Sequence, residues 1–435
     1  MIYLSNINIL SYLYNSFLDE KKRRYFKISE DHVVGVSYPY SLGNIYKNKK
    51  KSIESKKQRT FAQTAKKIRT CFFQRNLNRE LGKLHGGLFE HSLMYSYDML
   101  WIERLFLFDR KELSLQGGSS ITCLNFSPDM NNILFGTSDG LLGVVKVASI
   151  TKHHEFLQLN ISQSTSGLTS LNVSSNGIFI CTFMGNEKKP GHFQIGTIRK
   201  NTEENLSDYG INVTVIPQGK NTLWASAIAP SGEIAAIGGS KMAMVIKGID
   251  GANYTSYSYN LKSDVFAIKF LNTNTFLAGY RNGWIDLLDT RCLGSTKSCF
   301  TNSLIKHKSS ISNFDLTSDY HLVVAGLENS LNMYDIRMIH SEKDMFSRPV
   351  LFFNGYTNEC SFGLGFDISR NRRIVAASGQ DQIYFWSTLD GRLLRRIMVK
   401  SNRACRAFKF YETSTNSFEE LCLADDSYLE WWCSN

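Results

Sequence analysis

In two short stretches of the chain, an arginine stands two residues after an aspartate that directly follows an apolar run. They are Asp289-Thr290-Arg291 and Asp335-Ile336-Arg337. A guanidinium is planar and carries five N–H donors, so it can pair with two carboxylates or carbonyl groups of a partner at the same time. The chemistry that these residues indicate is recognition of another protein.

The motifs of phosphate binding and of metal binding are absent from the sequence. It holds no Gly-x-x-x-x-Gly-Lys phosphate loop. The nine cysteines are scattered without a Cys-x-x-Cys pair, which is typical of free thiols in a reducing compartment. No run approaches the roughly 18 apolar residues that span a bilayer. We therefore expect no enzyme activity, catalytic residue, metal site, cofactor, small-molecule substrate or membrane association.

The apolar runs before both arginines belong to a plan that recurs seven times. Each copy has an alternating apolar strand, a polar turn, a second apolar strand, a turn at Gly, Asn or Asp, and a third strand. Turns such as Asp139-Gly140 and Asn282-Gly283 allow the positive φ angles of tight hairpins. Spacings of 42 to 55 residues are typical of four-stranded propeller blades. The first strands are expected to start near Ile121, Leu168, Leu223, Val265, Ile311, Phe362 and Cys405.

The last copy offers three strands only, so its fourth strand must come from elsewhere. The segment from Trp101 to Phe108, just before the first copy, is a suitable apolar strand. Pairing it with the last copy would close the ring and cover an exposed sheet edge. We therefore predict an all-β, seven-bladed propeller over residues 95–435. The alternative, a pair of β-sandwiches, would not explain seven evenly phased copies.

Several copies resemble WD repeats. Lys306-His307, followed by Ile311, is similar to the Gly-His start of a WD blade, with Lys in place of Gly. Tyr334-Asp335 and Phe385-Trp386 occupy the place of the Trp-Asp end of its third strand. The resemblance depends on repetition, because no single blade matches fully.

The two Asp-x-Arg stretches lie inside a longer pattern. Phe276 to Arg291 is similar, in register, to the sixteen-residue box by which WD-repeat substrate receptors bind the adaptor of cullin-4 ubiquitin ligases, and Val323 to Arg337 follows it with one residue missing. Both depart at the Trp position, which holds Leu288 and Tyr334. The resemblance implies an adaptor-binding site made by Asp289, Arg291, Tyr334, Asp335 and Arg337. In the alternative, each arginine only ties its blade to the next through the preceding aspartate, or is solvated.

Four further segments resemble the cullin-4-associated factor 4 family. They are Ala278 to Cys292, His307 to Ile311, Gly379 to Ile397, and, near the start of the chain, Phe17 to Ile28. A propeller does not need the last of these in order to fold. The resemblance implies a substrate receptor that binds the large propeller adaptor of a cullin-4-type ligase and recruits an unknown target protein for ubiquitination.

Almost all of the net charge of +11 lies in the first quarter of the chain. Residues 1–110 hold 20 Lys and Arg against 10 Asp and Glu, whereas the remaining residues hold 30 and 29. Residues 1–60 are predicted to be a basic, largely flexible arm. Its clusters suit nuclear import, a solvated tail, or weak contact with nucleic-acid phosphates. The basic residues concerned are Lys47, Lys49, Lys50, Lys51, Lys56, Lys57 and Arg59.

Residues 61–94 are predicted to be an amphipathic helical segment. Apolar residues from Phe61 to Leu84 recur at helical spacing, and Gly86-Gly87 is expected to end the helices. The segment is expected to pack on the propeller or to extend to the adaptor. If the adaptor does not bind, the alternative function is a general assembly scaffold in a nuclear ribonucleoprotein or chromatin complex. Either function predicts a nuclear protein that is also found in the cytoplasm.

Overall fold

In a computed structural model, the structure describes residues 86–434 and two short strands at 16–19 and 24–27. Within the long stretch the residues left out are 116–117, 147–157, 187–189, 199–211, 218–220, 252–253, 293–299, 339, 341–344, 360, 402 and 413–418. The chain divides into two compact units, Met1–Ser92 and Leu93–Asn435. Among the described residues, no helix is long and apolar enough to cross a membrane.

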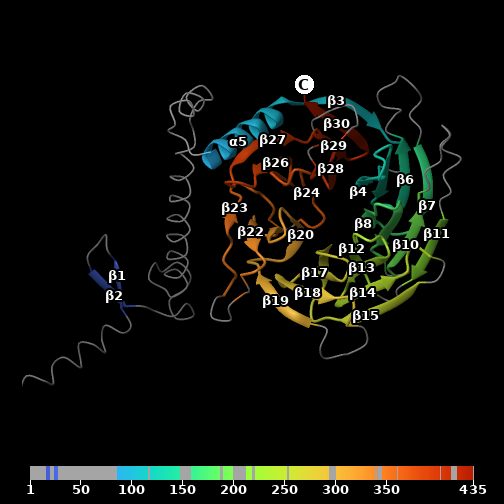
Figure 1. The fold of residues 1–435 in the computed structure, drawn as a ribbon, viewed down its shortest axis with the longest axis horizontal. Helices are drawn as coiled ribbons and strands as arrows, with labels where there is room; N and C mark the ends of the chain where they lie inside the picture. Colours follow the sequence, from blue (N-terminus) through green and yellow to red (C-terminus); the bar gives the residue numbers. More distant parts are fainter. Residues whose placement is uncertain are drawn as a thin grey trace, which may run out of the picture. The chain divides into compact units, whose positions relative to one another are not determined.

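The second unit is a ring of seven four-stranded antiparallel sheets (Figure 1), which confirms the predicted seven-bladed propeller. Except in blade 7, the strands follow chain order from the centre of the ring outwards. Blades 1 and 2 consist of β4 (Ile121–Phe126), β5 (Asn132–Thr137), β6 (Leu141–Lys146) and β7 (Gln158–Gln163), then β8 (Leu168–Val173), β9 (Ile178–Phe183), β10 (His192–Thr197) and β11 (Asn212–Pro217). Blades 3 and 4 consist of β12 (Leu223–Ile228), β13 (Ile234–Gly239), β14 (Met242–Lys247) and β15 (Thr255–Asn260), then β16 (Val265–Phe270), β17 (Thr275–Tyr280), β18 (Trp284–Asp289) and β19 (Phe300–Lys306).

The remaining three blades repeat this plan, and blade 7 takes its outermost strand from ahead of blade 1. Blades 5 and 6 consist of β20 (Ile311–Leu316), β21 (His321–Gly326), β22 (Leu331–Asp335) and β23 (Leu351–Phe352), then β24 (Phe366–Ile368), β25 (Ile374–Ser378), β26 (Gln382–Ser387) and β27 (Leu393–Met398). Blade 7 consists of β28 (Ala407–Glu412), β29 (Glu419–Asp425), β30 (Tyr428–Ser434) and β3 (Leu105–Glu112).

Burial differs between the middle and the outside of a blade. All six residues of β9 are buried, because both faces of this strand are covered by neighbouring blades. In contrast, the outer strand β15 is almost entirely exposed. The middle strands therefore contain continuous apolar runs. At the hairpins, Gly140 and Gly283 have φ angles of 90° and 85°, as the Asp-Gly and Asn-Gly pairs predict.

Five of the seven first strands begin at the predicted residue. The exceptions are β24 and β28, which begin at Phe366 and Ala407 instead of Phe362 and Cys405. Phe362 does not join the ladder. Its ring lies 4.5 Å from that of Phe266 and 5.4 Å from that of Trp224, on the inner strands of other blades. Glycine weakens a strand, and Gly363 has a φ of 71°, so the chain turns before pairing begins.

The predicted closing strand was placed four residues too early. β3 pairs with β30 from Leu105 to Glu112, but Trp101 to Arg104 are the last turn of helix α5 (Gly86–Arg104). The helix continues to this point because Trp101 packs in the core of blades 6 and 7. In addition, Arg395 donates from Nη1 to the terminal carbonyls of Ile102, Glu103 and Leu105 at 2.7, 3.1 and 2.7 Å.

The glycines at the start of α5 were also interpreted wrongly. Gly86-Gly87 begin this helix instead of ending one, and glycine is indeed accepted at a helix N-terminus. The predicted end of the helical segment at residue 94 therefore falls inside α5. Earlier in the chain, β1 (Ser16–Asp19) and β2 (Arg24–Lys27) pair as antiparallel strands and overlap the segment from Phe17 to Ile28. The basic residues from Lys47 to Arg59 and the predicted helices of residues 61–85 lie outside the described residues.

The two ends of the ring carry different connections. Strand direction alternates within each blade, so the turn between the first and second strands lies at the same end as the connection between the third and fourth. We call this end the lower face. The upper face carries the turn between the second and third strands and the connection to the next blade.

Candidate protein-interaction site

Both predicted arginines lie on the lower face, directly after the third strands of blades 4 and 5. β18 ends at Asp289 and β22 ends at Asp335. In blade 4, the Asp289 carboxylate accepts the backbone N–H of Arg291 at 2.9 Å, and it also accepts hydrogen bonds from Nε at 3.0 Å and Nη2 at 2.6 Å. The aspartate therefore folds the arginine back over the end of its own strand.

Blade 5 repeats this geometry. The Asp335 carboxylate accepts the backbone N–H of Arg337 at 3.0 Å, Nε at 3.0 Å and Nη2 at 2.6 Å. The hydrogen bonds from Arg337 lower the pKa of Asp335 to about 2, and those from Arg291 lower the pKa of Asp289 from its ordinary value. Both pairs are therefore ionised at neutral pH.

Pairing does not remove the arginines from solvent. The side chains of Arg291 and Arg337 are 67% and 60% exposed, while those of Asp289 and Asp335 are 12% and 7% exposed. In both arginines, Nη1 donates to no described residue. Each blade thus presents a cation that is held in one orientation and keeps donors for a further acceptor.

Tyr334, predicted to contact the adaptor, is buried in blade 5. Only 2% of it is exposed, and its hydroxyl lies 2.8 Å from Nδ1 of His307. Nε2 of His307 lies 2.9 Å from the Ser330 hydroxyl. Burial lowers the pKa of His307 to about 3, so this imidazole is neutral. Tyr334 therefore supports the strand that ends at Asp335 from inside the blade.

Sequence reasoning missed two exposed apolar residues beside Arg337. The guanidinium of Arg337 lies 4.3 Å from the centre of the Tyr320 ring, which is within cation–π range. Tyr320 is 50% exposed and the neighbouring Met338 is 64% exposed. Tyr320 lies in the turn between β20 and β21, and its carbonyl accepts the N–H of Ile336 at 2.9 Å. A tyrosine in an otherwise polar turn was the available signal.

The chemistry of this site is that of a protein surface. Arginine, tyrosine and methionine are enriched in protein–protein interfaces. Within the ranges that the structure describes, no three His, Cys, Asp or Glu residues form a group that could hold a metal. The arrangement can bind acidic or carbonyl groups and offers a small apolar contact beside them.

Fold and site define a seven-bladed β-propeller that exposes two oriented arginines on its lower face. No model of a protein family matches the chain. Over 409 residues it is 26% identical to WD repeat-containing protein 21 of Schizosaccharomyces pombe (strain 972 / ATCC 24843), and the aligned region covers 88% of each chain. This similarity and the seven blades together support a WD-repeat propeller, a fold suited to protein-interaction scaffolds. The resemblance to cullin-4 substrate receptors stays a prediction.

Proposed function

We propose that the chain is a non-enzymatic substrate receptor of a cullin-4-type ubiquitin ligase. Its lower face would bind the large propeller adaptor of the ligase, and another surface would hold the target protein. The observation that carries the proposal is the repeated Asp–Arg geometry in adjacent blades, with Arg291 and Arg337 oriented and exposed. The similarity of their sequence context to the adaptor-binding box supports the same partner.

The Asp–Arg pairs fit adaptor binding as well as they fit a purely internal role. One carboxylate cannot occupy all five N–H donors of a guanidinium, so an internal pair and adaptor binding are compatible. Here Asp289 and Asp335 engage Nε and Nη2 only, so Nη1 of each arginine remains available to an adaptor carboxylate or carbonyl. The fixed orientation lowers the entropy lost on binding.

The test replaces Arg291 and Arg337 by alanine together in the full-length chain. The double variant is expected to fold normally, because exposed ion pairs add little to stability. Its affinity for the adaptor is expected to fall by about a hundredfold or more, as when a charged partner is removed from an interface. Co-purification from cells and a binding titration with purified adaptor measure the loss.

Arg370 provides the matched control. It lies on the same face in the turn between β24 and β25, is 66% exposed, and pairs with Glu412 at 2.7 Å. Arg370→Ala should leave adaptor binding unchanged. Equal binding by the double variant and the wild type would refute adaptor docking through this site.

The basic arm favours a second candidate function, a scaffold in a nuclear ribonucleoprotein or chromatin complex. Ten Lys or Arg residues and one acid lie between Tyr46 and Arg69. In this case the chain would bind RNA or DNA with an affinity that falls steeply with salt, and deletion of residues 46–69 would abolish binding. Salt-independent binding, or binding that survives the deletion, would exclude this function for the arm. Nuclear localisation is proposed for both candidates.

A further inference from the structure

A pocket of about 280 Å³ opens on the upper face, where the last blade meets the first. Its walls come from three connections: the one between β27 and β28, the turn between β29 and β30, and the residues just before β4. The small side chains Ser120, Ala404 and Ala424 make the space. Two arginines, Arg403 and Arg406, line it with one acid, Asp426. The pocket therefore has an excess of positive charge.

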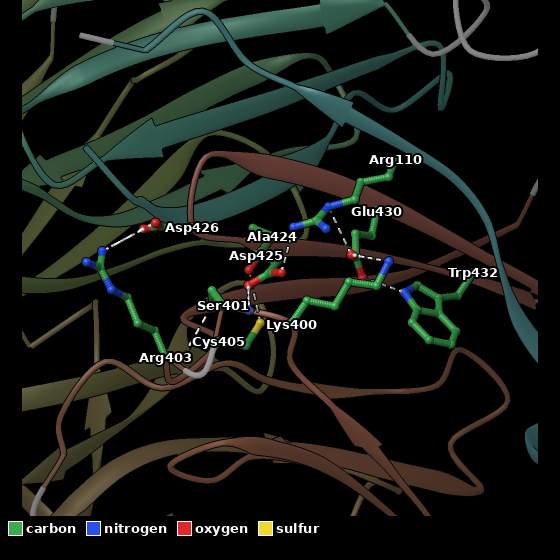
Figure 2. A network of polar contacts seen from close by, with 10 residues as sticks. All are labelled: Arg110, Lys400, Ser401, Arg403, Cys405, Ala424, Asp425, Asp426, Glu430 and Trp432. Atoms are coloured by element: carbon green, nitrogen blue, oxygen red, sulfur yellow. Dashed lines mark hydrogen bonds and ion pairs between the residues drawn. The ribbon is translucent and has the colours of Figure 1, made fainter. Parts of the chain in front are cut away.

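Arg403 is held in place while most of its donors remain available. Its Nη1 donates to both carboxylate oxygens of Asp426, at 3.1 and 3.3 Å. Figure 2 shows this pair apart from the buried carboxylates of Asp425 and Glu430. Nε and Nη2 of Arg403 donate to no described residue, and its side chain is 68% exposed. One acid thus orients the guanidinium and leaves its other donors for a ligand.

Arg406 has no acidic partner among the residues that the structure describes, although it is exposed at the pocket wall. The connection that carries it is anchored between the two arginines. Cys405 is 2% exposed, and its thiol donates to the carbonyl of Ala424 at 3.3 Å (Figure 2). The Ser120 hydroxyl adds a donor that binds no described residue.

The connection between β27 and β28, which lines the pocket, is linked through Asp425 to β3, the strand that closes the ring. Arg110 of β3 forms an ion pair with the buried Asp425 at 3.1 Å, and Asp425 accepts the N–H of Ser401 at 3.3 Å (Figure 2). The connection between β27 and β28 is therefore held at both of its halves. A site on such a support loses little entropy when a ligand binds.

We propose that this pocket binds the phosphate group of a phosphorylated serine or threonine in a target protein. Two guanidinium groups and a hydroxyl around a small hollow match a tetrahedral dianion, which paired arginines recognise in many phosphopeptide sites. The hollow is small by the standard of ligand pockets, so it accepts one side chain and not a long polyanion. A nucleic-acid backbone would need an extended basic groove instead.

The site is independent of adaptor docking, because it lies on the opposite face of the ring and is tested on the purified chain alone. The probes are two degenerate peptide pools that are identical except for a central phosphoserine or serine. Full-length wild type is expected to bind the phosphorylated pool at least about tenfold more tightly, as charge-assisted hydrogen bonds predict. Equal binding of the two pools would overturn the proposal.

Variants then locate the site. Arg403→Ala and Arg406→Ala should each weaken phosphopeptide binding by about tenfold. Ala404→Glu, which places a carboxylate in the pocket, should weaken phosphopeptide binding to a similar extent. The control is Arg281→Ala, since Arg281 is also on the upper face and pairs with Asp264 at 3.5 Å, away from the pocket. Thermal unfolding identifies any variant that does not fold.

Two other phosphate-containing ligands are tested separately. Inorganic phosphate and an oligothymidylate are titrated against the same proteins. If oligothymidylate binding depends on Arg403 and Arg406 and phosphopeptide binding does not, the pocket serves nucleic acid and the proposal is wrong. The proposal is also wrong if inorganic phosphate binds and the phosphopeptide pool does not, or if the arginine variants bind the pool like wild type.

Discussion

Blades 4 and 5 end in the same way but are built differently inside. Both hold an arginine against the aspartate at the end of the third strand, with nearly equal distances. At the residue before the aspartate, blade 4 has Leu288, which is 1% exposed in an apolar cluster. Blade 5 has Tyr334 there, hydrogen-bonded to the buried His307.

The difference shows which part of the site depends on the neighbouring sequence alone. The Asp–Arg geometry needs only the Asp-x-Arg sequence at the end of a strand, because it forms above an apolar interior and above a polar one. The surroundings of the arginine, however, depend on the blade. Arg337 lies over Tyr320, whereas Arg291 has no aromatic ring near it among the described residues. Blade 5 therefore offers the richer contact surface.

The largest expected effect is a loss of stability when the residue before the aspartate is truncated. It tests whether this residue supports the core in both blades. Tyr334→Ala should lower the free energy of unfolding by about 4 kcal/mol and Leu288→Ala by about 3 kcal/mol, because both open a cavity in a packed core. Denaturant titration followed by tryptophan fluorescence measures both. A loss below about 1 kcal/mol for Tyr334→Ala would mean that this side chain is free to contact a partner.

The polar interior of blade 5 contains a titratable histidine, His307, which should make the free energy of unfolding depend on pH. Leu288 in blade 4 cannot contribute in this way. The folded protein lowers the pKa of His307 from 6.5 to about 3, so the unfolded chain binds the proton first as pH falls. Stability is therefore full above about pH 6.5 and is lost towards pH 3, with a slope of up to about 1.4 kcal/mol per pH unit. Unfolding titrations across this window measure the slope.

The control is His307→Gln, which keeps hydrogen-bonding groups but does not titrate. Its unfolding free energy should vary less between pH 6.5 and 4 than that of the wild type. The same slope in both proteins would show that other groups cause the acid sensitivity.

Tyr320 is the next test, on binding instead of folding. Tyr320→Ala removes the ring beneath Arg337 and should weaken adaptor binding about threefold, the size of an exposed cation–π contact. Asn274→Ala is the matched control and should have no effect, because the Asn274 carbonyl accepts the N–H of Thr290 in blade 4 as the Tyr320 carbonyl accepts that of Ile336 in blade 5. If both variants bind alike, blade 5 has no advantage over blade 4 at the interface.

The smallest expected effect is the contribution of Asp335 and Asp289 to stability at low pH. The pKa of Asp335 is lowered from 3.8 to about 2, so its contribution to stability is present above about pH 4 and is lost as pH falls towards 2. Asp335→Asn should remove this low-pH component, and Asp289→Asn should remove a smaller one. Carboxyl NMR titration of the wild type gives both pKa values directly, and an ordinary value for Asp335 would contradict the observed pairing.

The strand positions that every blade repeats could be predicted from the sequence. The features that depend on residues far apart in the chain could not. Strand starts at Ile121 or Val265 follow from local alternation, which every blade repeats. The end of α5 depends on Arg395, far away in the chain, so Trp101 to Arg104 looked like strand. Tyr320 joins the site only because His321 pairs with Asp335, and the pattern of either strand alone does not reveal that register.

The pairing of β3 with β30 has a consequence for how the protein is made. During translation β3 leaves the ribosome first among the strands of the ring, but its partner β30 is the last of these strands to be synthesised, and Leu105 pairs with Ser434. Until then the edge of β3 is uncovered, and blade 7 does not exist. We expect the nascent chain to need chaperone protection while the seven blades are being synthesised, and the ring to close only after β30 has been made.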